Sequence, residues 1–139
     1  MSEFYNKENL PKGSVQIKKT KKVPFLKTVN ANRHLALNPN STDLVGTAPG
    51  TIYGWILGQG TEHTIKDRAG NEWTFYLEYS RPYYNTYEKT TGLLVPVLGK
   101  TKEETLERLS RMEFKQAMDH NKNLIEALEE FRHYLEATK

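Results

Sequence analysis

The chain has 139 residues, of which 37% are hydrophobic and 27% are charged, and its formal net charge is +3. This length fits one domain that spans residues 1–139, and the composition excludes a wholly disordered chain. Cysteine is absent, which excludes disulfides, thiolate metal sites and cysteine nucleophiles.

The apolar runs of the sequence are all far shorter than the ~20 residues that a membrane-spanning helix needs. The N-terminus also lacks the apolar core of a signal peptide. We therefore expect no interaction with a membrane and an intracellular, cytoplasmic location, which would be the host cell if the protein is viral.

The basic character of the chain is concentrated at its N-terminus. Residues 1–33 carry seven lysines and one arginine against two glutamates, a local charge of +6. The predicted basic patch consists of Lys18, Lys19, Lys21 and Lys22. Such a patch can neutralise phosphates and give salt-dependent binding of nucleic acid. The alternative is a solvated segment or an edge strand that lysines protect from aggregation.

The first third of the chain predicts short strands between loops. Residues 1–13 form an irregular lead-in, because asparagine, proline and glycine break any periodicity. Strands are expected at 14–17 and 23–29, and Pro24 would place the second at an edge or at its own start. Residues 34–37 are short and ambiguous. Residues 38–50 have the chemistry of a loop.

The middle third gives the clearest strand signals. Residues 51–57 predict a buried strand that ends in a turn at Gly58-Gln59-Gly60. Residues 62–66 and 72–79 predict a hairpin, joined by a loop at 67–71. In the second strand of this hairpin, alternation places four residues on one face, namely Trp73, Phe75, Leu77 and Tyr79. The opposite face then carries Thr74, Tyr76 and Glu78.

A last strand is expected at 91–98, with Pro96 at an edge or a bend, before the character of the sequence changes to helical. Thr101 and Glu104 form a capping box. Apolar residues then repeat at helical spacing, with low helix propensity near 119–123. This pattern predicts a helical hairpin or one long bent helix at about residues 102–137. Its apolar stripe would pack on the chain's own sheet or, alternatively, on a second copy in a homodimer.

Strands followed by helices, without alternation, predict an α+β fold. An antiparallel, twisted sheet or a small open barrel would occupy about residues 14–98. The helical region would occupy residues 101–138.

The sequence nominates no catalytic residue. Gly58-Gln59-Gly60 lacks the remaining residues of a dinucleotide fingerprint or a P-loop. Glu62, His63 and Asp67 lack a convincing further metal ligand. We therefore predict no catalytic site, no metal and no cofactor. A deep pocket lined by His63 and several carboxylates would favour an enzyme instead.

Aromatic residues cluster near the middle of the chain, since seven of the fifteen lie between residues 73 and 87. The second half of this stretch has turn-like sequence, and tyrosines in a loop are typical of a contact surface. Interfaces favour tyrosine and arginine, and nucleic-acid bases stack on exposed rings. The predicted partner-binding residues are Arg81, Tyr83, Tyr84, Tyr87 and Tyr76. The alternative is that these rings pack beneath the C-terminal helices.

Two functions follow from these features. The favoured one is a non-catalytic protein-binding module, such as an adaptor, inhibitor or assembly component of the kind that viruses and mobile elements encode. The alternative is nucleic-acid binding of low sequence specificity, through the basic patch and the tyrosines. The small net charge and the net acidic residues 101–139 favour the protein partner.

Overall fold

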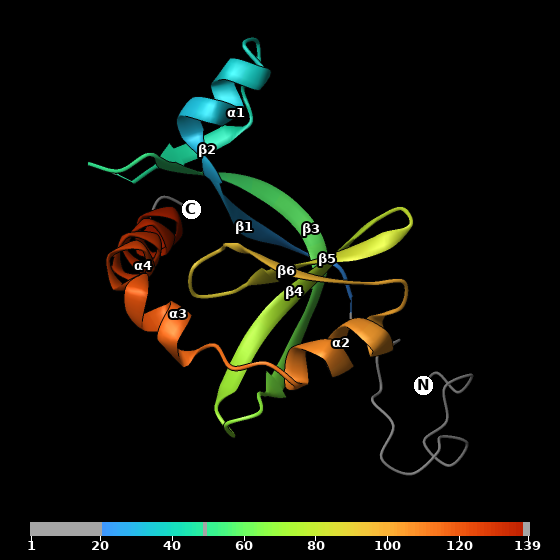
Figure 1. Ribbon diagram of the computed structural model, residues 1–139. Helices are drawn as coiled ribbons and strands as arrows, with labels where there is room; N and C mark the ends of the chain where they lie inside the picture. The colour runs from blue at the N-terminus through green and yellow to red at the C-terminus, as the bar shows by residue number, and fades with distance from the viewer. Residues whose placement is uncertain (1–20, 49, 138–139) are drawn as a thin grey trace.

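The computed structural model of the protein describes residues 21–48 and 50–137. These residues form an open antiparallel sheet of six strands, followed by C-terminal helices (Figure 1). The predicted α+β class is therefore confirmed, and the sheet is not closed into a barrel. The predicted lead-in at 1–13 and the predicted strand at 14–17 lie outside the described residues.

The strands join mainly as neighbours along the chain. They are β1 Val23–Asn30, β2 Leu44–Thr47, β3 Tyr53–Lys66, β4 Glu72–Ser80, β5 Tyr83–Glu88 and β6 Leu94–Gly99. Their order is β1-β3-β4-β5-β6, and β2 also pairs with β3. Pro24 lies in β1 and Pro96 in β6, the first and last strands of this order. This agrees with the prediction, because proline has no backbone N–H to donate and is therefore tolerated in edge strands.

The glycines of β3 correct one prediction, because Gly58-Gln59-Gly60 is no turn but the middle of this strand. A Cβ atom at Gly60 would lie 2.5 Å from the carbonyl oxygen of Leu77. A Cβ atom at Gly58 would lie 3.0 Å from side-chain atoms of Phe25, Lys27 and Glu78. The glycines thus allow close approach of neighbouring chain segments instead of ending the strand.

Three further segments of the β region differ from the sequence prediction or were left open by it. Residues 34–37 belong to a helix, α1 Ala31–Leu37, whose N-cap Asn30 accepts a hydrogen bond from the amide of Arg33. The loop expected at 38–50 contains strand β2. The residues after the central hairpin are also a strand, β5, so the turn that joins it to β4 is only Arg81-Pro82.

The helical region contains three helices, where one or two were expected. They are α2 Lys102–Ser110, α3 Lys115–His120 and α4 Lys122–Ala137. The break expected near 119–123 is present at Asn121, and a second one separates α2 from α3. This second break is anchored by Phe114, which is buried in one core cluster with Phe75 and Leu109.

The apolar stripe of α4 packs on the chain's own sheet. Leu128 is fully buried with Leu26 and Trp55, and the ring of Phe131 stacks on Trp55 at a centroid distance of 4.6 Å. The apolar stripe of α4 therefore packs against the sheet of the same chain. The alternative prediction was that it packs on a second copy in a homodimer. Within residues 21–48 and 50–137, no helix is both long and apolar enough to cross a membrane.

Candidate functional site

The aromatic residues of the β4–β5 hairpin differ widely in exposure. Tyr83 lies directly after the turn and is 38% exposed, and Arg81 in the turn is exposed. Tyr84 is half-buried against the core cluster of α2 and contacts Tyr79 at a ring distance of 5.0 Å. Tyr79 itself is 52% exposed, the most of the aromatic residues in this stretch. The end of the hairpin therefore presents aromatic rings to solvent.

The remaining two predicted partner-binding residues lie further inside. Tyr76 is buried and stacks on Phe25, with ring centroids 4.5 Å apart and planes 3° from parallel. Burial raises the pKa of Tyr76 to about 12. Tyr87 is half-buried against the same Phe25, and the ammonium of Lys27 lies 5.3 Å from its ring centroid. These two rings belong to the packing of β1 on the sheet, and Tyr76 lies away from the exposed end of the hairpin.

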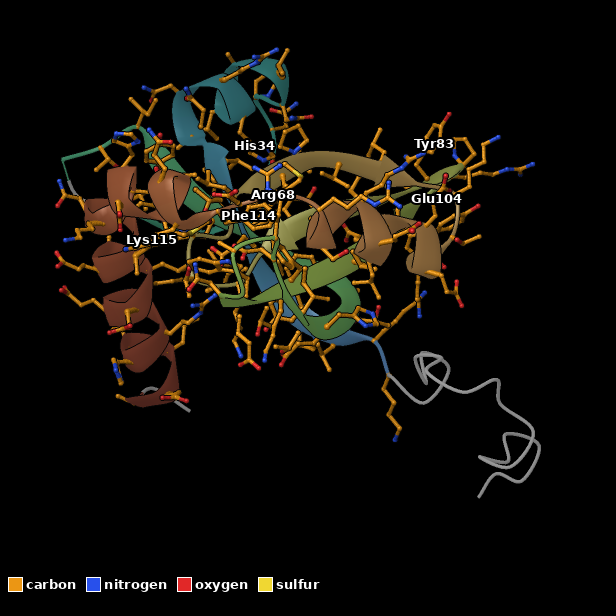
Figure 2. All side chains as sticks on the ribbon, turned by 60° about the horizontal axis from the view of Figure 1, so that its bottom comes forward. His34, Arg68, Tyr83, Glu104, Phe114 and Lys115 are labelled. Carbon is orange, nitrogen blue, oxygen red and sulfur yellow. The ribbon has the colours of Figure 1, made fainter. Side chains whose placement is uncertain are left out.

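Basic residues from three distant parts of the chain meet the hairpin end. Tyr84 pairs with Gly99 in the sheet, so Lys100 follows directly beside the hairpin. Lys102, at the start of α2, lies close enough to Lys22 for the two charges to repel. Figure 1 shows the β4–β5 turn, the start of α2 and the start of β1 on the same side of the molecule. Figure 2 shows Tyr83 on this side and Lys115 on the opposite one.

We call this surface the tyrosine–lysine end. Its members are Tyr79, Arg81, Tyr83, Lys100, Lys102, Lys21 and Lys22. None of its five cationic side chains forms an ion pair with another described residue. Burial lowers the pKa of Lys102, and the charge of Lys22 lowers it further, against the opposing effect of Glu103. Cations that repel one another and form no ion pair with the described residues favour a negatively charged partner.

Sequence reasoning found only part of this surface. It identified Arg81, Tyr83, Lys21 and Lys22, whereas Lys18 and Lys19 of the predicted patch lie outside the described residues. It missed Lys100 and Lys102, which are isolated in the sequence and gain their neighbours from the β5–β6 pairing. It assigned Tyr79 to the core face by alternation, but the core ends at Leu77, before the strand does.

A second surface feature lies between β3 and α2. It is a hollow of about 470 Å³ lined by His63 and three carboxylates, those of Glu62, Glu103 and Glu107. His63 is buried, and its Nε2 atom lies 2.8 Å from the hydroxyl of Thr61, which is also buried. Burial lowers the pKa of His63, and Lys102 adds to this effect, so the imidazole is neutral near pH 7. The described residues contain no group of three or more side chains that could hold a metal ion.

The hollow therefore matches the description that would favour an enzyme, but its histidine is engaged inside the protein. A general base needs a ring nitrogen within hydrogen-bond reach of a substrate proton. The Nε2 atom of His63 meets the buried Thr61, which leaves Nδ1 as the ring nitrogen for such a role. Glu107 is paired with Arg111 at 2.8 Å, and Glu62 with Lys89 at 3.7 Å. Two of the three carboxylates and one ring nitrogen of His63 are therefore already engaged by other residues of the chain.

A third feature follows the edge strand β6. Its residues alternate between buried and exposed, and Leu94 and Leu98 are the exposed large apolar ones. Beside the strand is a hollow of about 200 Å³, whose walls include Pro96, Phe114 and Met118. The strand edge and the hollow together form an apolar surface suited to a protein partner.

Comparison of the chain with protein families, with curated proteins and with solved structures gives no match.

Proposed function

We propose that the protein binds single-stranded nucleic acid with low sequence specificity at the tyrosine–lysine end. One observation carries this proposal: exposed tyrosine rings and five cations without an ion-pair partner among the described residues, far apart in the sequence, lie at the same end of the molecule. Rings that stack bases and cations that contact phosphates are the two components of a sequence-tolerant single-strand site.

The geometry of the β4–β5 hairpin suggests which path a bound single strand of nucleic acid would follow. Tyr84 pairs with Tyr79 across the hairpin, so these two side chains share one face. Side chains alternate along β5, so Tyr83 lies on the opposite face. A single strand that stacks one base on Tyr79 and another on Tyr83 must cross the turn between them. Arg81 lies in that turn, where its guanidinium can contact the phosphate of the crossing nucleotide.

The arrangement of charge supports this proposal more than the net charge of +3 does. Of the carboxylates near this end, Glu78 is paired with Lys27 and Glu104 with Arg108, whereas Glu103 acts on its neighbour Lys102. The cations of the tyrosine–lysine end have no such partners among the described residues. Binding of a polyanion depends on this local potential and not on the sum over the whole chain.

The proposal is tested by fluorescence anisotropy with a labelled single-stranded oligonucleotide of mixed sequence at low salt. We expect saturable binding, and weaker binding of a duplex with the same sequence, because paired bases are not free to stack. Stacking contributes about 1–3 kcal/mol per base. The double substitution Tyr79→Ala/Tyr83→Ala should therefore weaken binding about 30-fold or more.

Tyr134→Ala is the matched control, because Tyr134 is 61% exposed on α4, away from the tyrosine–lysine end. It should bind the oligonucleotide as the unchanged protein does. Equal losses in the double variant and in the control, or no binding of the oligonucleotide at low salt, would contradict the proposal.

We also propose protein binding as a second candidate, supported by the exposed apolar edge of β6. An extended segment of a partner can add to such an edge, with its side chains in the adjacent hollow. Affinity purification from the native host, with and without nuclease, separates the two candidates. A stoichiometric partner should survive nuclease treatment and be lost in Leu94→Asp/Leu98→Asp but not in Leu37→Asp, which changes an exposed leucine of α1. Recovery of nucleic acid alone would contradict this second candidate.

A further inference from the structure

A hollow of about 520 Å³ lies between the C-terminal half of α4 and strands β1, β3 and β4. Its apolar walls are Phe25, Leu26, Leu57 and Leu135, and Tyr76 lies among them. Leu57 is 57% exposed, although it is a large aliphatic side chain in the middle of a strand. The volume is in the range of small-molecule sites, which combine apolar walls with a few polar groups.

The cationic residue that lines this hollow is Arg132. It is half-buried, and it donates one hydrogen bond to the backbone carbonyl of Lys89. No described carboxylate forms an ion pair with it. Burial lowers the pKa of Arg132, although the nearby Tyr76, Glu88 and Glu129 oppose this effect. A guanidinium has five N–H donors, so Arg132 keeps donors for a further acceptor.

The acidic groups around Arg132 do not take the place of an ion-pair partner. Glu88 is fully buried, and its two oxygens accept hydrogen bonds from the backbone amides and hydroxyls of Thr90 and Thr91. Glu136 also lines the hollow, and its carboxylate is 4.0 Å from the imidazole of His133. The cation is thus partly desolvated and left without a direct anionic contact.

We propose that this hollow binds a small carboxylic acid with an apolar chain. The chain would cover Phe25, Leu26 and Leu57, and the carboxylate would pair with Arg132. A guanidinium matches a carboxylate with two parallel hydrogen bonds, so the charged end of the ligand is fixed while its apolar end is recognised only by shape. This site is separate from the tyrosine–lysine end and does not depend on the function proposed there.

Isothermal titration calorimetry with three ligands of one chain length tests the charge requirement: octanoate, octan-1-ol and octylammonium. Octanoate should bind at one site per chain and about tenfold more tightly than octan-1-ol, because only the carboxylate forms charge-assisted hydrogen bonds with Arg132. Octylammonium should bind more weakly still. Equal binding of all three ligands, or no saturable binding of octanoate, would overturn the proposal.

Variants then locate the site. Arg132→Gln should weaken octanoate about tenfold and leave octan-1-ol unchanged, whereas Leu57→Asp should weaken both ligands. Arg111→Gln, which changes an exposed arginine of the α2–α3 connection, should leave octanoate binding unchanged. Tyr79→Ala/Tyr83→Ala should also leave it unchanged, which distinguishes this site from the tyrosine–lysine end. The comparison of the three ligands needs no variant, so it tests the proposed carboxylate site even if Arg132→Gln does not fold. Unchanged octanoate affinity in a folded Arg132→Gln protein would overturn the assignment to this hollow.

Discussion

The salt dependence of nucleic-acid binding follows quantitatively from the charges of the tyrosine–lysine end. Five cations lie there without ion-pair partners among the described residues: Lys21, Lys22, Arg81, Lys100 and Lys102. If each cation neutralises one phosphate of a single-stranded nucleic acid, a plot of the logarithm of the binding constant against the logarithm of the salt concentration has a slope of about −3.5. The affinity should then drop about 100-fold between 50 mM and 200 mM salt.

Removing two of these charges tests the assignment. Each neutralising substitution should make the slope shallower by about 0.7, so Lys100→Gln/Lys102→Gln should give a slope of about −2.1. The assay is fluorescence anisotropy of a labelled oligonucleotide, titrated at several salt concentrations between these limits. Lys115→Gln is the matched control, because Lys115 lies on the opposite side of the molecule (Figure 2) and pairs with Asp119 at 3.4 Å. Its slope should equal that of the unchanged protein.

Either of two results would refute the assignment of phosphate contacts to the cations of the tyrosine–lysine end. One is a slope near zero with measurable affinity, since binding would then not depend on phosphate contacts. The other is an equal change of slope in Lys100→Gln/Lys102→Gln and in Lys115→Gln, since the contacts would then be spread over the whole surface.

Two further predictions concern the fold. Gly60→Ala should lower the free energy of unfolding by about 1–3 kcal/mol in urea titrations, because the added Cβ atom would lie 2.5 Å from the backbone oxygen of Leu77. An unchanged urea midpoint would contradict this expectation and show that β3 can shift away from Leu77. Burial alone would raise the pKa of Asp67, but hydrogen bonds to its carboxylate, from Trp73 and from the amides of Asn71, Phe114 and Ala69, lower it. The stability that Asp67 contributes is therefore present above about pH 4 and lost as the pH falls through the lowered pKa. Urea midpoints measured from pH 6 to pH 2 should fall less steeply for Asp67→Asn than for the unchanged protein, and parallel curves would contradict this role.

The sequence predicted the parts of the fold that depend on local patterns. The central hairpin follows from alternation on both sides of a short polar loop, and its register pairs Lys66 with Glu72 around that loop. The start of α2 follows from the capping box, since the Thr101 hydroxyl accepts a hydrogen bond from the amide of Glu104. Both signals act within a few residues, so no knowledge of distant contacts is needed.

Features set by contacts distant in sequence could not be predicted in the same way. The glycines of β3 look like turn residues, and only the close approach of distant residues, such as Leu77 at Gly60 and Phe25 at Gly58, explains them as part of a strand. The break between α2 and α3 depends on Phe114, whose amide donates to Asp67 across the core. Neither relation leaves a signal in the local sequence.

The candidate site shows the same limit. Tyrosine composition indicated a contact surface, but it could not separate exposed Tyr83 from buried Tyr76, because the difference arises from the stacking of Phe25. Lys100 and Lys102 join the site only through the pairing of β5 with β6. A sequence-based analysis can therefore name the residue types of this surface but not its boundary.

The most direct test of nucleic-acid binding at the tyrosine–lysine end is an NMR titration of the isotope-labelled protein with a mixed-sequence single strand. We predict that the amide resonances of residues 79–81, 83–84 and 99–103, together with those of Lys21 and Lys22, shift most and saturate together. The resonances of α3 should stay in place. Saturating shifts confined to other surfaces, or no shifts at low salt, would contradict the account.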